Sequence, residues 1–251
     1  MIVIRKLKPM PLWQSIVFFA IPTVIFFFSI YVIMPSLGEA GIAPIINYSL
    51  TLMGPVFLLF VSSFVALKID GYTLNWNTIK MRFRLKPLKK REWIWTIFLS
   101  LFMVFGNFIL SPTQKWILNT VNFDPPPYLP STLNPQITLN GIPPEFETTP
   151  IVILLVFQLF FLFFNIFGEE FWWRGYILPR QELAHGRYTW IIHGLLWTLF
   201  HVFWWWNLLF LLPGALAASF VAQKLENTTI IIVAHLVVNT LGGTLLMLLG
   251  S

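Results

Sequence analysis

The chain has 251 residues, of which 57% are hydrophobic and 10% are charged, and its net charge is +6. Soluble domains carry about 25% charged residues, and the mean hydropathy of +0.76 excludes that class. The absence of cysteine excludes disulfides, a thiolate nucleophile and cysteine-bound zinc. We therefore expect an all-α, polytopic transmembrane helical bundle that forms a single domain over residues 1–251.

Apolar windows of about 20 residues, the length that crosses ~30 Å of hydrocarbon, recur along the chain. We predict about seven spans, near residues 13–35, 45–67, 92–110, 150–173, 188–206, 207–223 and 229–249. The first resembles a signal peptide because basic residues precede it, but its apolar stretch is too long for an h-region. At residues 204–207 two apolar runs meet with almost no polar linker, which predicts either a tight helical hairpin or a re-entrant element.

The basic residues predict the orientation of these spans. With a cytoplasmic N-terminus, all but Lys115 of the 16 lysines and arginines fall in cytoplasmic segments. The same distribution favours an odd number of spans and an external C-terminus. We expect the basic cluster at residues 80–91 to contact anionic lipid headgroups. The bilayer thus explains the net positive charge, and we expect no nucleic-acid partner.

Residues 111–149 are the only long polar stretch between predicted spans. Runs of proline at residues 125–127 and 143–144 punctuate it. It predicts a proline-rich external loop with polyproline segments rather than a second folded domain. Residues 179–187 form a second, shorter polar stretch, which predicts a cytoplasmic connector.

Few ionisable or amide side chains remain within the predicted spans. Those in the last four predicted spans include Gln158, Asn165, Glu169, Glu170, His193, His201, His235 and Asn239, with Arg174 at a helix end. A carboxylate at the centre of a membrane helix costs about 2.5–3.5 kcal/mol on insertion scales, so such groups usually face a protein interior and have a function there. The two adjacent glutamates therefore predict a site.

Glu169 and Glu170 must have different roles, because adjacent side chains diverge by about 100° around a helix. Arg174 follows Glu170 at the spacing that pairs a carboxylate with a guanidinium. We therefore pair those two, which leaves Glu169 free to face a cavity beside Asn165.

Hydrogen bonding between helices is the simpler interpretation of Gln158, Asn165 and His193. His185 lies in the predicted connector, where we expect it to be solvated.

The remaining polar residues recur at helical spacing. Trp197 and His201 are four residues apart, as are His235 and Asn239, so each pair shares a helix face. Together with Glu169, three helices offer groups of the kinds that activate water and bind an oxyanion.

Zinc is the alternative, because Glu169, His201 and His235 would provide the His2Glu ligand set of a hydrolytic site. There is no H-E-x-x-H pair, and Asn239 is a better hydrogen-bond donor than a zinc ligand. We favour a metal-free glutamate mechanism and leave zinc open.

The run Glu169-Glu170-Phe-Trp-Trp-Arg174 resembles E-E-x-x-x-R, the first motif of the CAAX protease and bacteriocin-processing (CPBP, also called Abi) intramembrane proteases. Trp197-Thr-Leu-Phe-His201 resembles the second motif, aromatic-x-x-x-His, and His235-Leu-Val-Val-Asn239 resembles the third, H-x-x-x-N. The resemblance covers residues 150–249, the motif-bearing catalytic core, and leaves the first three predicted spans unmatched. Trp197 stands where Phe or Tyr is commoner, which we expect to change packing more than chemistry.

The resemblance implies a conical cavity that opens to the membrane and the cytoplasm. It also implies that the protein hydrolyses a peptide bond in a membrane-bound substrate, and prenylated CAAX-type peptides are one class of such substrates. Carried over by position, it assigns six roles: Glu169 as general base, His201 as its partner in activating water, His235 and Asn239 as the oxyanion-binding pair, and Glu170 and Arg174 as supporting residues.

Two other functions fit parts of the pattern. A non-catalytic membrane scaffold or bacteriocin-immunity protein would keep the same fold and use the polar pocket for binding. A small secondary transporter would use buried acids and histidines as a proton relay, but it predicts inverted repeats, which we do not find. Serine proteolysis is disfavoured by the lack of a G-x-S-x-G run.

The predicted depths of the site residues disagree. At ~1.5 Å per residue, His235 lies shallow, His201 lies roughly 20 Å deep, and Glu169 lies near the inner boundary. We therefore expect either that the helix carrying Glu169 continues past Arg174, or that the connector before Tyr188 dips into the membrane.

Overall fold

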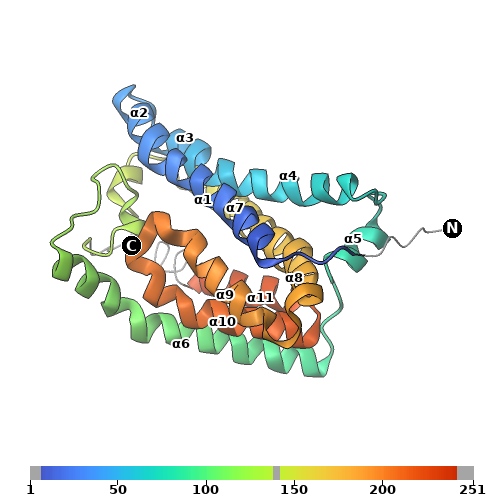
Figure 1. Ribbon diagram of the computed structural model, residues 1–251. Helices are drawn as coiled ribbons and strands as arrows, with labels where there is room; N and C mark the ends of the chain where they lie inside the picture. The colour runs from blue at the N-terminus through green and yellow to red at the C-terminus, as the bar shows by residue number, and fades with distance from the viewer. Residues whose placement is uncertain (1–6, 138–141, 242–251) are drawn as a thin grey trace.

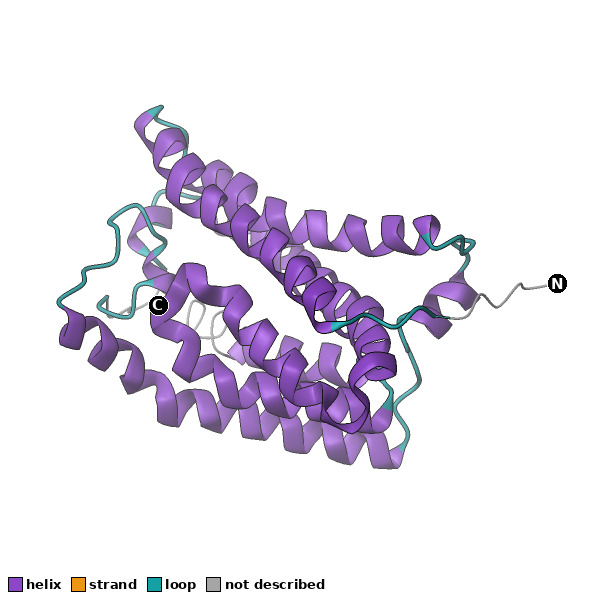
Figure 2. Cartoon of the chain, viewed as in Figure 1, coloured by secondary structure: helices purple, strands orange, loops and turns teal. Residues whose placement is uncertain are grey.

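The computed structural model describes residues 7–137 and 142–241. Helices joined by short turns make up this part of the chain, and it contains no strand (Figure 2). The all-α fold expected from the composition is therefore confirmed.

The first half of the chain forms three long helical runs. Their elements are α1 (Leu12–Phe28), η1 (Ser29–Ile33), α2 (Met34–Glu39), α3 (Pro44–Tyr48), η2 (Ser49–Met53), α4 (Gly54–Ile69), α5 (Trp76–Arg82) and α6 (Lys90–Val121). Pro35, Pro44 and Pro55 lie in the first turn of α2, α3 and α4. Pro44 begins a helical run, where the first N–H groups have no intrahelical partner, whereas Pro35 and Pro55 directly follow the π-helical segments η1 and η2 within longer runs.

The second half carries all three motifs. After the short turns η3 (Ser131–Leu133) and η4 (Pro144–Phe146), its elements are α7 (Ile151–Glu170), η5 (Phe171–Ile177), α8 (Leu178–His185), η6 (Gly186–Tyr188), α9 (Thr189–Phe200), η7 (His201–Asn207), α10 (Leu208–Leu225) and α11 (Thr228–Asn239).

Four helical runs of the described chain are long and apolar enough to cross a membrane, against the seven spans expected. They are Leu12–Glu39, Pro44–Ile69, Lys90–Val121 and Ile151–Leu225. The last holds three of the expected spans, because its helices are joined by the short turn at Gly186 and the kink at Trp204 instead of by polar linkers. α11 is a shorter apolar helix, and much of the seventh expected span (229–249) lies outside the described residues. The count of seven is not confirmed.

Both polar stretches contain more helix than expected. α6 continues to Val121, so the segment between α6 and α7 is shorter than the loop predicted at residues 111–149. Most of the predicted connector at residues 179–187 is α8, in which Pro179 occupies the first turn. The helical run continues from η5 through Pro179, so the polar composition of this stretch gave the wrong boundary.

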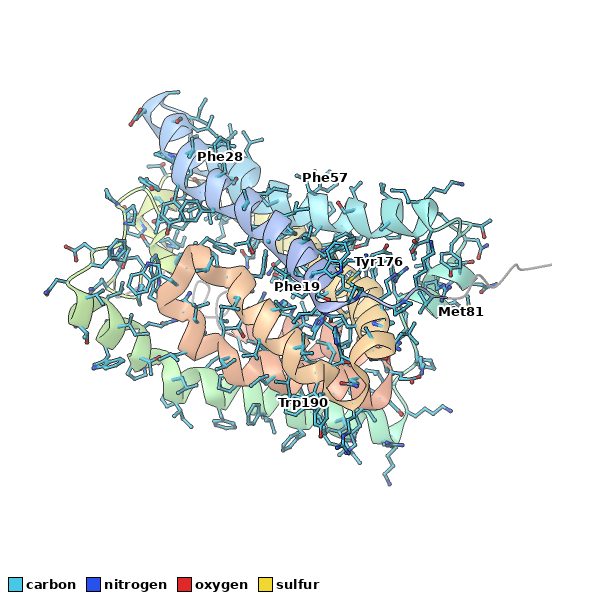
Figure 3. All side chains as sticks on the ribbon, viewed as in Figure 1. Phe19, Phe28, Phe57, Met81, Tyr176 and Trp190 are labelled. Carbon is cyan, nitrogen blue, oxygen red and sulfur yellow. The ribbon has the colours of Figure 1, made fainter. Side chains whose placement is uncertain are left out.

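α7 packs against α4 and α11 (Figure 1), and burial is concentrated at its C-terminal end, where Glu169 and Glu170 lie. α10 packs against α9 and α6, and α6 runs along the outside of the molecule. Apolar side chains such as Phe28 and Phe57 are exposed on α1 and α4 (Figure 3). Exposed apolar surface on this scale is what a lipid-facing protein presents, and the chain is an integral membrane protein.

A glycine fixes the closest approach of α7 to α4. A Cβ at Gly168 would lie 2.4 Å from the carbonyl oxygen of Val56. Real Cβ atoms do not come this close to a backbone oxygen, so any larger residue would push the two helices apart. Because Glu169 follows Gly168 directly, this contact sets the depth at which the first motif lies against α4.

Candidate active site

The two glutamates end α7, and the chain continues directly into the π-helical segment η5. Every residue of η5 is buried, and helical conformation continues through α8 to His185. Of the two arrangements that could reconcile the predicted depths, the structure therefore has the first, in which this helix continues past Arg174. π-helical turns occur frequently at functional sites, because the extra residue per turn re-aims the side chains around it.

Glu170 forms a buried ion pair with Arg174, as their spacing predicts. Arg174 Nη1 lies 3.1 Å from Glu170 Oε1, and the two side chains are only 2% and 1% exposed. The same oxygen lies 2.9 Å from Nδ1 of His235 on α11. Glu170 thus joins the first motif to the third. This contact was not expected, because the sequence grouped His235 with Asn239 only.

The contact to Glu170 constrains the proton positions on His235. A carboxylate that already accepts from Arg174 is an acceptor for Nδ1, so Nδ1 carries a proton and donates it. In the neutral ring Nε2 is then an acceptor, and it can donate only when the ring holds both protons. Glu170 therefore decides which hydrogen bonds His235 can make on its other side.

Glu169 is also buried but makes no ion pair among the described residues. Its Oε2 accepts a hydrogen bond from Nε1 of Trp197, at 3.0 Å. The tryptophan in the second motif therefore does more than change packing, contrary to our expectation, because Phe has no donor at this position. The sequence held no signal for this bond, because other buried tryptophans of the described chain, such as Trp173 and Trp206, leave their indole nitrogens without a partner.

His201 follows the last residue of α9 and opens the turn η7. Its Nδ1 lies 3.0 Å from the backbone oxygen of Trp197, which can only accept, so Nδ1 donates. Nε2 of the neutral ring is consequently an acceptor. The rings of Phe200 and Phe203 pack against His201, with ring centroids 4.7 Å and 5.7 Å away.

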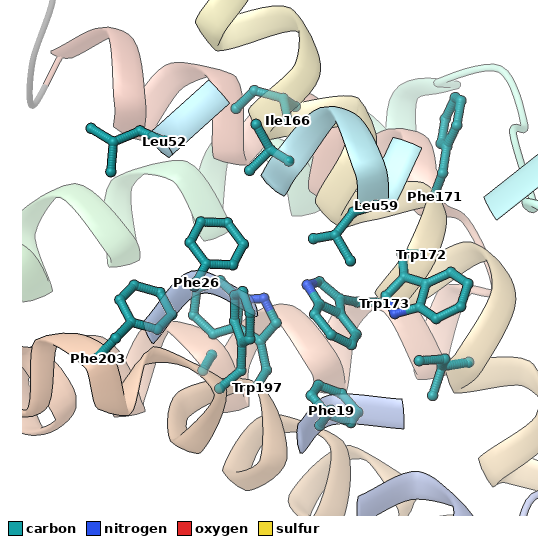
Figure 4. Packing of buried hydrophobic residues seen from close by; sticks show 14 of the residues in the cluster. Phe19, Phe26, Leu52, Leu59, Ile166, Phe171, Trp172, Trp173, Trp197 and Phe203 are labelled. Atoms are coloured by element: carbon teal, nitrogen blue, oxygen red, sulfur yellow. The ribbon is translucent and has the colours of Figure 1, made fainter. Parts of the chain in front are cut away.

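The ring of Trp197 contacts residues of all three motifs. The Arg174 guanidinium lies 4.9 Å from the ring centroid, the His201 ring 4.4 Å and the His235 ring 6.5 Å. Figure 4 shows Trp197 among the buried rings near Trp173, Phe26 and Phe203. The motif residues, far apart in the sequence, therefore meet around one tryptophan.

The remaining polar residues of the spans are less connected to this cluster. Asn239, the last residue of α11, is half-buried one turn after His235. His193 is fully buried and its Nδ1 lies 2.6 Å from Oε1 of Gln181 on α8, which agrees with a hydrogen bond between helices. Asn165 is half-buried on α7.

The described side chains do not fit a three-ligand metal site. Across residues 7–137 and 142–241, no three His, Asp or Glu side chains are grouped so that they could hold a metal ion. His235 and Glu170 are instead bonded to each other. The set Glu169, His201 and His235, which the zinc alternative requires, is therefore not assembled here.

An apolar pocket of about 250 Å³ lies between α1 and α4. Phe26 and Leu59 line it, and Trp172 of the first motif closes one side. It lacks the charged groups of the motifs, so it is not the conical cavity that the family resemblance implies. That cavity is not confirmed.

Comparison with known families agrees with the motifs. Residues 151–241 match the model of the family described as Rce1-like, type II CAAX prenyl endopeptidase, which confirms the resemblance to the CPBP proteases. The matched segment begins at the first residue of α7 and includes Glu169, His201 and His235. The family is one of proteases that act on membrane-associated substrates. No curated protein and no solved structure matches the chain.

Proposed function

We propose that this chain is an intramembrane endopeptidase of the glutamate type, which hydrolyses a peptide bond in a membrane-bound, prenylated CAAX-type substrate. The observation that carries the proposal is the contact of Trp197 with Glu169, Arg174, His201 and His235. Residues that serve only to hold helices together do not need to converge from three separate motifs around one ring.

Glu169 is the base in this mechanism. It lacks the ion pair that occupies Glu170, and its carboxylate is held by a single neutral donor of Trp197. A water molecule gives a proton to Glu169 as its oxygen attacks the carbonyl carbon of the scissile bond. His201 assists through Nε2, which accepts a hydrogen bond from the same water because Nδ1 donates to a backbone carbonyl.

His235 and Asn239 stabilise the tetrahedral intermediate. The amide of Asn239 donates to the oxyanion, and Nε2 of His235 donates when the ring is doubly protonated, with Glu170 offsetting its charge. The proton held by Glu169 then passes to the leaving amine, and the peptide bond breaks. Arg174 supports this pair by holding the carboxylate of Glu170 in place.

The orientation follows from the basic residues. We propose a cytoplasmic N-terminus and an external C-terminus, since the exposed lysines and arginines near α5 and the start of α6 then face the cytoplasmic leaflet.

Replacement of Glu169 tests the proposal. Purified full-length protein, reconstituted in lipid nanodiscs, is given a fluorogenic farnesylated CAAX peptide, and cleavage is confirmed by mass spectrometry. We expect Glu169→Gln to lower kcat by about 10²–10⁴-fold, the usual contribution of a general base. Gln keeps the size of the side chain and an acceptor for Trp197, so the site should remain folded.

Glu226→Gln is the matched control, because its side chain is 61% exposed and its ion pair is with Lys86, which belongs to none of the three motifs. It should cleave the peptide like the parent protein. Full activity of folded Glu169→Gln would remove the proposed base. If the parent protein also cleaved no peptide, the non-catalytic scaffold or immunity protein would be the better description.

A further inference from the structure

Trp197 joins the catalytic carboxylate to the rest of the site. Its side chain is buried, its indole N–H donates to Glu169, and its ring face carries the guanidinium of Arg174. The backbone oxygen of the same residue accepts from His201. One residue therefore contacts the base through its side chain and the base's partner through its main chain.

We propose that Trp197 is a positioning residue for Glu169 and that its indole N–H, rather than its bulk, sets the direction of the carboxylate. The catalytic meaning of this role rests on the proposed function, whereas the hydrogen bond itself does not. A glutamate side chain has three rotatable bonds, and nothing in its own helix turn fixes them. The donor at 3.0 Å holds one oxygen of the carboxylate and thereby orients the other.

The ring of Trp197 also keeps the positive charge of Arg174 beside Glu170 and away from Glu169. The Arg174 guanidinium is held between Glu170, at 3.1 Å, and the face of Trp197, at 4.9 Å from the ring centroid. If the ring were absent, this cation could swing toward Glu169, since both acids lie on the same turn. Trp197 thus keeps Arg174 on Glu170 and leaves Glu169 with a neutral partner.

Bulk alone does not account for this arrangement. Trp173 and Trp206 are also fully buried, yet their indole nitrogens have no hydrogen-bond partner among the described residues. The chain therefore tolerates buried tryptophans that only fill space. At position 197 the nitrogen is satisfied by the carboxylate of the proposed base.

Two replacements of Trp197 separate the donor from the ring. Trp197→Phe keeps an aromatic ring and removes the N–H, and substitution with 3-benzothienylalanine removes the N–H while the bicyclic shape is kept. We expect each to lower kcat by about 100-fold, the effect of a misplaced reacting group, with KM for the farnesylated peptide changed less than about threefold. Trp206→Phe is the matched control and should retain the parent kcat.

A second readout does not depend on activity. In protein labelled with ¹⁵N-tryptophan, the indole N–H signal that disappears in Trp197→Phe should shift in Glu169→Ala and stay in place in Glu226→Gln. An unmoved signal, or a benzothienylalanine variant with the parent kcat, would overturn the positioning role. If Glu169→Gln remained fully active while the indole signal still shifted, the proposed function would fail but the contact would stand.

Discussion

Removal of the Glu170 carboxylate leaves the guanidinium of Arg174 buried without its ion-pair partner. At 3.1 Å and an effective dielectric constant of about 20, Coulomb's law gives roughly 5 kcal/mol for the lost attraction. Breaking a buried pair by removing one partner costs about 3–5 kcal/mol in proteins. We therefore expect Glu170→Gln to lower the free energy of unfolding by about 3–5 kcal/mol.

Unfolding by sodium dodecyl sulfate in mixed micelles, followed by circular dichroism, measures this change. The matched control is Glu226→Gln, which breaks an exposed pair with Lys86 at 3.7 Å. Exposed pairs contribute about 0–1 kcal/mol, so the control should unfold near the parent protein.

A double variant tests whether the unpaired charge of Arg174 causes the loss of stability in Glu170→Gln. Replacing Glu170 by Gln and Arg174 by Met removes both charges, and buried pairs replaced in this way often lose little stability. The double variant should be at least as stable as Glu170→Gln alone. The reasoning is refuted if Glu170→Gln unfolds within about 1 kcal/mol of the parent, or if the two substitutions simply add.

Three further results are expected. Gly168→Ala forces a Cβ against the Val56 carbonyl, 2.4 Å away, and should cost about 1–3 kcal/mol in the same titration and reduce peptide cleavage. Asn227→Ala removes the side-chain cap that accepts from Thr229 N at 3.1 Å and should cost about 1 kcal/mol. Zinc chelation should leave cleavage unchanged; one stoichiometric zinc, measured by mass spectrometry and lost together with activity, would refute the metal-free mechanism.

Features set by local periodicity could be predicted from the sequence. The pairing of Glu170 with Arg174 follows from the spacing of four residues on a helix, and the structure contains that pair. The all-α class follows from long apolar runs, because helices satisfy every backbone group inside the segment. The three motifs were likewise readable in order along the chain.

Contacts between helices could not be predicted in this way. The bond from His235 to Glu170 depends on how far α11 slides along α7, and no local pattern encodes that register. The span count is not confirmed, since residues 151–225 form one long run of helical segments that turns at Gly186 and kinks at Trp204. The polar stretch at residues 179–187 predicted a connector, but the helical run continues from η5 through Pro179 into α8.

The two histidines of the site are not interchangeable, because their Nδ1 atoms face different acceptors. His201 donates to a neutral carbonyl, so Nε2 of its neutral ring is an acceptor, the role toward water that the proposed mechanism gives it. His235 donates to the carboxylate of Glu170, which fixes the proton on Nδ1 and leaves Nε2 on the other side of the ring. In the proposed mechanism, loss of the Glu170 carboxylate should therefore impair oxyanion binding by His235 as well as stability, whereas Glu169 and His201 make no contact with that carboxylate.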